Sequence, residues 1–277
     1  MLNLLSKNIL IYGGTNGLKS LIPLMMLPIL TSHISISDFG TLSLIETSVL
    51  FLTPFILLNV NSAINVEFFK LEHDKLKIYI SNSLLLSMIS FVCFLLIFFV
   101  LKRQFANLFD FDQSIVVFLV LFAGLRVVSS VTLSILQVTG RANHYAYFSI
   151  FQAVIEFTLS YLLVVLYQTG YLGRLYAIYI AFFISSIIGI YILFRGDYIG
   201  KITLNYSKDI LKFGIPLIPH VVGGTIMAMS DRYFISYFFE NEAVGLYTIA
   251  YQMSAIMLLV SMSVNQAWTP MLFKLLQ

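Results

Sequence analysis

The sequence has few charged residues. Only 10% of its 277 residues are Asp, Glu, Lys or Arg, whereas 59% are hydrophobic. A soluble domain carries about 25% charged residues, because it must cover its surface with polar groups. This composition excludes an ordinary soluble domain and predicts that lipid surrounds most of the chain.

Cysteine and metal-ligand clusters are also scarce. Cys93 is the single cysteine, so the chain cannot form an internal disulfide or a thiolate metal site. The four histidines, at positions 33, 73, 144 and 220, are scattered, and no carboxylate cluster has metal-ligand spacing. The net charge of +3 gives no indication of nucleic-acid binding. We therefore expect no metal, no cofactor, no nucleic-acid partner and no enzymatic activity.

Long apolar runs dominate what remains. A helix needs about 20 mostly apolar residues to cross a bilayer, and eight such segments occur. The period-two alternation of membrane barrel strands is absent. The sequence therefore predicts an all-α polytopic membrane protein with about eight transmembrane helices. The expected spans are 8–31, 40–63, 79–101, 114–137, 146–167, 172–194, 213–238 and 245–268.

The basic residues of the connections indicate the orientation. Lys and Arg are enriched in cytoplasmic loops. If the N-terminus is inside, ten of them lie on the cytoplasmic side and three, Lys102, Arg103 and Arg174, on the outer side. We therefore expect both termini to be cytoplasmic. The cytoplasmic set is Lys7, Lys70, Lys75, Lys77, Arg141, Arg195, Lys201, Lys208, Lys212 and Lys274.

Weak matches between the two ends of the chain predict an internal repeat. Residues 8–13 resemble 209–214, and residues 38–42 resemble 243–247, in the same order along the chain. The repeat unit is about six spans, and both copies start from the same side, as in some transporters. We expect a first six-helix lobe at 1–200 and the first two helices of an incomplete second lobe at 201–277. A truncated protein of about twelve spans is favoured over a natural eight-span protein.

The first and seventh spans share glycines and prolines at corresponding places. Pro23 lies in the first span, and Pro216 and Pro219 lie in the seventh. Proline removes a backbone donor, and the carbonyls it frees need protein or water partners in a membrane. Gly/Pro-interrupted helices at matching positions of two repeats indicate a transporter's substrate path, so we expect helix breaks at these prolines.

Six ionisable residues fall within the predicted spans, away from the ends of the third and sixth spans. Such residues are costly in lipid and usually face a wet interior. Two roles remain open for them: structural ion pairs, such as Lys19 or Arg126 with Glu156, or a cavity that holds an anionic substrate. In the second case the cations bind the substrate and the carboxylates exchange protons or sodium. We expect spans one, two, four, five and seven to line this interior, and spans three and six to face lipid. The candidates are the cations Lys19, Arg126 and Arg232, the carboxylates Glu46, Glu156 and Asp231, and the polar Asn16 and Gln152.

Several stretches together resemble a known family. They are Lys-Phe-Gly-Ile-Pro-Leu-Ile-Pro-His at 212–220, Ser-Asp-Arg-Tyr-Phe-Ile at 230–235, Ala-Val-Gly-Leu-Tyr-Thr-Ile-Ala-Tyr at 243–251 and Ala-Trp-Thr-Pro at 267–270, with Asp-Phe-Gly at 38–40. They resemble the polysaccharide transporter (Wzx-like O-antigen flippase) family. That family belongs to the superfamily that includes multidrug extruders and lipid II flippases.

The resemblance implies two six-helix lobes around a central cavity, alternating access and coupling to an ion gradient. It implies a bacterial inner-membrane protein that moves undecaprenyl-diphosphate-linked oligosaccharide for O-antigen or capsule synthesis. Membrane lipids and the polysaccharide polymerase machinery are further expected partners. The alternatives are a multidrug or cation antiporter of the same superfamily and an inactive truncated remnant. A membrane polymerase is disfavoured because the outer loops are short.

Overall fold

The computed structural model describes residues 2–109, 111–254 and 257 of the chain, and these residues form helices and no strands. The helices are α1 (Leu2–His33), α2 (Ile36–Leu57), α3 (Val60–Glu67), α4 (His73–Val100), α5 (Lys102–Phe109), α6 (Gln113–Val138), α7 (Ala142–Tyr161), α8 (Gly170–Arg195), α9 (Ser207–Met229) and α10 (Asp231–Phe238). A π-helical turn, η1 (Leu162–Leu166), follows α7, and a 3-10 turn, η2 (Leu204–Tyr206), precedes α9. A further helical segment begins at 241 and is described as far as 254.

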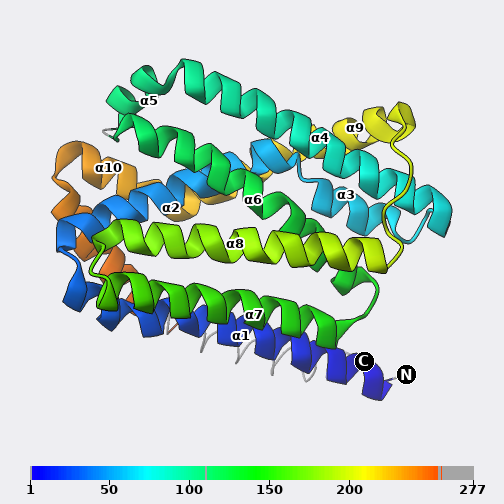
Figure 1. Ribbon diagram of the computed structural model, residues 1–277, viewed down its shortest axis with the longest axis horizontal. Coiled ribbons are helices and arrows are strands. Elements are labelled where there is room, and N and C mark those ends of the chain that lie inside the picture. The colour runs from blue at the N-terminus through cyan, green and yellow to red at the C-terminus, as the bar shows by residue number, and fades with distance from the viewer. Residues whose placement is uncertain (1, 110, 255–256, 258–277) are drawn as a thin grey trace, which may run out of the picture.

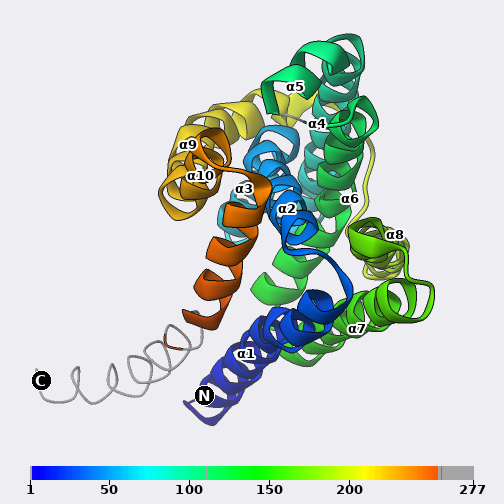
Figure 2. The ribbon, with the colours of Figure 1, turned by 90° about the vertical axis from the view of Figure 1, so that its left-hand side faces the viewer.

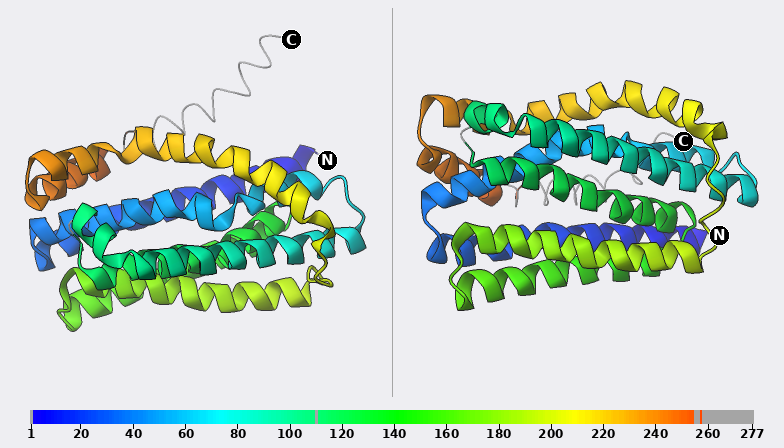
Figure 3. Two further views of the ribbon diagram at one scale, coloured as in Figure 1. Left: turned by 90° about the horizontal axis from the view of Figure 1, so that it is seen from above. Right: turned by 45° about the horizontal axis from the view of Figure 1, so that its top comes forward.

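The long helices lie roughly along the long axis of one elongated bundle (Figures 1 and 3). Figure 2 views this bundle from one end: α1 and α7 lie together at one side, α9 and α10 lie at another, and α2 is central. Packing follows this layout, since α7 contacts both α8 and α1, while α2 contacts α6.

Six helices of the described residues are long and apolar enough to cross a membrane, by length and composition. They are Ile36–Leu57, His73–Val100, Gln113–Val138, Ala142–Leu166, Gly170–Arg195 and Ser207–Met229. The all-α polytopic membrane class is therefore confirmed. The 32-residue α1 is not among these six, because Asn16, Lys19 and its glycines and prolines lower its hydropathy. The expected eighth span extends beyond 254 and so lies partly outside the described residues.

Two expected spans are divided in the structure. The span predicted at 40–63 ends as α2 at Leu57, because Leu58 and Asn59 adopt left-handed backbone angles with φ of 52° and 49°. The span predicted at 213–238 divides at Ser230 into α9 and the short α10. Both single-helix predictions were wrong, because hydropathy reports the apolar run and not a local change of backbone direction.

The chain stays helical through the prolines at which breaks were predicted. Pro23 lies inside α1, and Pro216 and Pro219 lie inside α9. A proline removes one donor from the helix, and membrane helices tolerate that loss when neighbouring groups satisfy the freed carbonyl. The prediction that these three residues interrupt their helices is therefore corrected.

The start of α2 approaches the helical segment 241–254 very closely. A Cβ atom on Gly40 would collide with the carbonyl oxygen of Asn241, and one on Gly245 would collide with the carbonyl oxygen of Ile36. The hydroxyl of Thr248 donates to Ser43 Oγ at 2.9 Å beside this contact. Only glycine allows backbones to pack at this distance. The two glycines are corresponding positions of the repeat that the sequence predicts.

Candidate functional site

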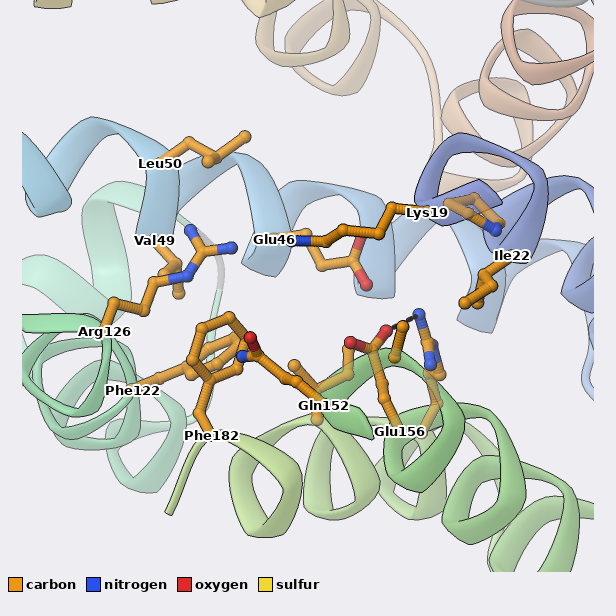
Figure 4. A pocket seen from close by; sticks show the side chains of 14 residues that line it. Lys19, Ile22, Glu46, Val49, Leu50, Phe122, Arg126, Gln152, Glu156 and Phe182 are labelled. Atoms are coloured by element: carbon orange, nitrogen blue, oxygen red, sulfur yellow. Dashed lines mark hydrogen bonds and ion pairs between the residues drawn. The ribbon is translucent and has the colours of Figure 1, made fainter. Parts of the chain in front are cut away.

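A cavity of about 290 Å³ lies between five helices of the bundle. Figure 4 shows its charged and polar side chains pointing into the same space from opposite walls. The charged residues come from α1 (Lys19), α2 (Glu46), α6 (Arg126), α7 (Glu156) and α8 (Arg174). The remaining lining residues are Ile22, Pro23, Val49, Leu50, Phe122, Gln152, Ala153, Ile178 and Phe182.

The cavity gathers six of the residues predicted from the sequence and leaves out five. Those that line it are Lys19, Pro23, Glu46, Arg126, Gln152 and Glu156. Those that do not are Asn16, Pro216, Pro219, Asp231 and Arg232. In the described residues α9 contributes no side chain to this cavity, whereas α8 contributes three. The expectation that span seven lines this interior and span six faces away from it was therefore wrong for this cavity.

Glu156 is held by an arginine that the sequence reasoning placed elsewhere. Arg174 Nη2 lies 2.7 Å from Glu156 Oε1, and Arg174 Nη1 donates to Ser160 Oγ, also at 2.7 Å. The Arg174 side chain is 7% exposed and that of Glu156 is 20% exposed. A structural ion pair was one of the two roles left open for Glu156, and its partner is Arg174 in place of Lys19 or Arg126.

Local structure explains why Arg174 was missed. Arg174 lies at the start of the span expected at 172–194, and a cation at the end of a span is normally assigned to the adjoining loop. In the structure α7 ends in the π-helical turn Leu162–Leu166, and Gly170 then starts α8 with φ of 63°. This sharp return sets Arg174, in the first turns of α8, against Ser160 and Glu156 on α7. Glu156 and Ser160 lie four residues apart on the same helix, so both face the same side of α7. A carboxylate inside a membrane span needs a hydrogen-bond donor, and this was the signal in the sequence that pointed to a partner such as Arg174.

Arg126 is positioned by aromatic rings. Its guanidinium carbon lies 5.5 Å from the ring centre of Phe122 and 5.0 Å from that of Phe182. Such cation–π contacts orient a guanidinium without neutralising it. Among the residues that the structure describes, Arg126 has no carboxylate within ion-pair distance, and the same holds for Lys19.

Gln152 adds an unused donor to the cavity wall. The residue is 4% exposed, and its Nε2 has no hydrogen-bond partner in the described structure. A buried amide N–H without a partner costs free energy, so this position favours a ligand that offers an acceptor. Gln152 lies one helical turn before Glu156 on α7.

The other predicted residues make contacts of their own outside the cavity. Arg232 is buried, stacks over the ring of Tyr251 at 5.0 Å, and lies 4.0 Å from Asp231. Asp231 accepts a hydrogen bond from the hydroxyl of Tyr247. Asn16, on α1, accepts from the hydroxyl of Tyr145 on α7 at 3.3 Å.

Two comparisons with solved structures show the fold. The chain is 17% identical to an inward-facing multidrug resistance MATE family transporter of the MOP superfamily, with a TM-score of 0.65, over 86% of this chain and 58% of that one. It is 18% identical to a MATE in complex with MaD3S, with a TM-score of 0.67, over 92% of this chain and 61% of that one.

Sequence comparison supplies the family. An uncharacterized membrane protein of Haemophilus influenzae is 28% identical over 262 residues, which are 92% of this chain and 62% of that protein. The chain thus spans less than two thirds of this relative and of both structures. The family model described as polysaccharide biosynthesis protein matches residues 5–276. A match over almost the whole chain, together with the MATE fold around a charged cavity, means that this chain belongs to the polysaccharide biosynthesis protein family.

Proposed function

We propose that the protein is a flippase for lipid-linked oligosaccharide. The substrate is an oligosaccharide repeat unit on undecaprenyl diphosphate, and the protein moves it across the bacterial inner membrane by alternating access. The product serves surface polysaccharide synthesis, as O-antigen or capsule. Membership of the polysaccharide biosynthesis family and the MATE fold support a transport role.

The observation that carries this proposal is the unpaired positive charge of the cavity. Three cations, Lys19, Arg126 and Arg174, face two carboxylates, Glu46 and Glu156, which gives 3 − 2 = +1. Arg174 is used by Glu156, so Lys19 and Arg126 remain for a ligand. A diphosphate cannot cross hydrocarbon without compensation of its charge, and a cationic cavity supplies that compensation.

The cavity also fits the neutral part of such a substrate. The Nε2 of Gln152 offers a donor to a sugar hydroxyl or carbonyl, and Phe122 and Phe182 supply flat apolar faces beside Arg126. A volume of about 290 Å³ holds a diphosphate or a single sugar ring, so this cavity is proposed as the head-group subsite and not as the whole path. Both termini are proposed to be cytoplasmic.

The direct test is substitution of Arg126 by Ala in cells that lack their own flippase. Wild-type protein should restore surface polysaccharide, and Arg126→Ala should reduce it at least about tenfold, because a buried charge-assisted contact to phosphate is lost. Arg195→Ala is the matched control, since Arg195 is an exposed arginine of α8. Normal polymer at normal protein level in Arg126→Ala would remove Arg126 from the mechanism.

A second candidate is an exporter of cationic compounds, and one observation favours it. Glu46 lines the cavity and forms no ion pair within the described residues. A carboxylate of this kind can hold an organic cation. Resistance to cationic dyes conferred by wild-type protein, together with no effect on surface polysaccharide, would favour this candidate over the flippase.

A further inference from the structure

The pair formed by Glu156 and Arg174 decides which cavity cations are free. Within the described residues it is the one ion pair among the five charged side chains of the cavity. Ser160 strengthens it, because its hydroxyl accepts from Arg174 while it donates to the backbone carbonyl of Glu156 at 2.6 Å. A buried pair with these additional hydrogen bonds is held in a single geometry.

Lys19 is the cation that Glu156 would attract if Arg174 were absent. Lys19 lines the same cavity as Glu156 and Arg126, and its side chain enters that cavity from α1 (Figure 4). A carboxylate that is 20% exposed has little water to compensate its charge. Without a guanidinium beside it, Glu156 would draw the flexible Lys19 side chain across the cavity.

We propose that Arg174 is a positioning residue that keeps Lys19 available to the anionic part of the substrate. In this role Arg174 acts through Glu156: its Nη2 donates to Glu156 Oε1 and its Nη1 donates to Ser160 Oγ, and direct contact with the anion is the rival role that the variants below test. This inference rests on the proposed function for the ligand, but the state of Lys19 can be measured without any ligand.

Three variants separate positioning from direct contact. Arg174→Gln leaves two cations and two carboxylates, so the cavity charge falls to 2 − 2 = 0. Arg174→Gln combined with Glu156→Gln gives 2 − 1 = +1, the same as wild type. Arg195→Gln changes an exposed arginine on the same helix and controls for the general loss of one positive charge.

The first measurement is the rate at which a small amine-acylating reagent modifies Lys19, followed by peptide mass spectrometry. An ammonium held by a carboxylate gives up its proton less readily, so it reacts more slowly. Arg174→Gln should slow modification of Lys19 about tenfold relative to the exposed Lys70, which serves as the internal reference. The double variant should recover the wild-type rate, and Arg195→Gln should match wild type.

The second measurement is the binding of inorganic pyrophosphate to purified protein. Arg174→Gln should weaken binding about tenfold, and the double variant should bind within about threefold of wild type. A double variant that binds as weakly as Arg174→Gln would mean that Arg174 contacts the anion directly, and would overturn the positioning role. Unchanged Lys19 modification in Arg174→Gln would overturn it as well.

The two measurements also separate this inference from the proposed function. If Lys19 modification follows the expected pattern but wild-type protein does not bind pyrophosphate, the positioning role stands and the diphosphate substrate is rejected. If wild-type protein binds pyrophosphate but Lys19 modification is the same in all variants, the flippase proposal stands and the role of Arg174 is rejected.

Discussion

When it is ionised, Glu46 places a negative charge in a cavity whose proposed ligand is an anion. Glu156 is compensated by Arg174, but no cation of the described residues lies within ion-pair distance of Glu46. An ionised Glu46 therefore opposes anion binding. A carboxylate that gains a proton or a sodium ion would remove that opposition, which makes Glu46 the proposed coupling residue in preference to Glu156.

Replacing Glu46 with Gln should separate binding from transport. The cavity charge rises from +1 to 3 − 1 = +2, so pyrophosphate should bind at least about threefold more tightly. Surface polysaccharide should fall, because the carboxylate that repels the bound anion is gone and the substrate is released more slowly. The two measurements are pyrophosphate titration of purified protein and quantification of surface polymer in cells.

The matched control is Glu242→Gln, which removes an exposed carboxylate far along the chain from this cavity. It should leave both readouts at the wild-type level. If Glu46→Gln lowers transport and also weakens pyrophosphate binding, the variant has disturbed the cavity as a whole, and Glu46 loses its proposed role.

At the scale of helices, the sequence was informative wherever a single helix carried the pattern. Gln152, Glu156 and Ser160 follow one another at four-residue steps, which puts all three on one face of α7, and the structure buries Gln152 and Ser160. Apolar run length gave the bounds of α6 and α8 to within two residues of the expected spans. These features depend on local periodicity, which one sequence contains.

The features that the sequence missed depend on contacts between helices or on backbone direction. Arg174 becomes a cavity residue because η1 and Gly170 turn α8 back against α7. The division of the second span depends on two left-handed residues, Leu58 and Asn59, of which only Asn commonly adopts that conformation. Neither can be derived from hydropathy, because both concern how apolar segments turn and meet.

The contact between α2 and the segment 241–254 leads to a prediction about packing. Gly245→Ala would place a Cβ against the carbonyl oxygen of Ile36, and Gly40→Ala would place one against that of Asn241. Backbone atoms cannot move aside as a flexible side chain can, so overpacking should cost about 1–3 kcal/mol. Each variant should lower the thermal unfolding midpoint of the purified protein.

Gly224→Ala provides the control for these two variants. Gly224 lies inside α9, and an added Cβ would meet nothing within 4 Å. Alanine at this position should leave the midpoint unchanged or raise it, because glycine inside a helix is destabilising by about 0.5–1 kcal/mol relative to alanine. Equal effects at positions 40, 245 and 224 would show that the close approach does not govern stability.

On the scale of the whole molecule, one connection joins α8 to α9 and so links the two predicted repeats. It crosses the N-terminal end of α4 (Figure 1) and is attached there by several contacts. Gly200 exchanges two hydrogen bonds with the Ser81 hydroxyl, at 2.9 and 3.1 Å, and Thr203 N donates to Asn82 Oδ1 at 3.0 Å. Asp197 forms an ion pair with Lys77 and lies 3.4 Å from His73 Nε2.

Asp197 makes this attachment sensitive to pH. The hydrogen bond from the Lys77 ammonium, with a smaller contribution from His73, holds the pKa of the Asp197 carboxyl below its ordinary value. Because the folded-state pKa is lowered, the ion pair stabilises the attachment above the ordinary carboxyl pKa of about 3.9. That contribution disappears as the pH falls through the lowered folded-state pKa.

Hydrogen exchange of the peptide covering 198–206 should therefore depend on pH in a defined way. After correction for intrinsic exchange rates, protection in wild type should be constant from about pH 5 to 7 and should decrease as the pH falls below about 4. Asp197→Asn keeps a residue type that tolerates the φ of 59° at this position but removes the charge. The variant should show lower protection at neutral pH and no decrease on acidification.

Asp74→Asn is the control, because it removes the other carboxylate near Lys77, at 3.4 Å, and leaves Asp197 in place. An acid-induced decrease that persists in Asp197→Asn would mean that Asp197 does not hold the connection against α4.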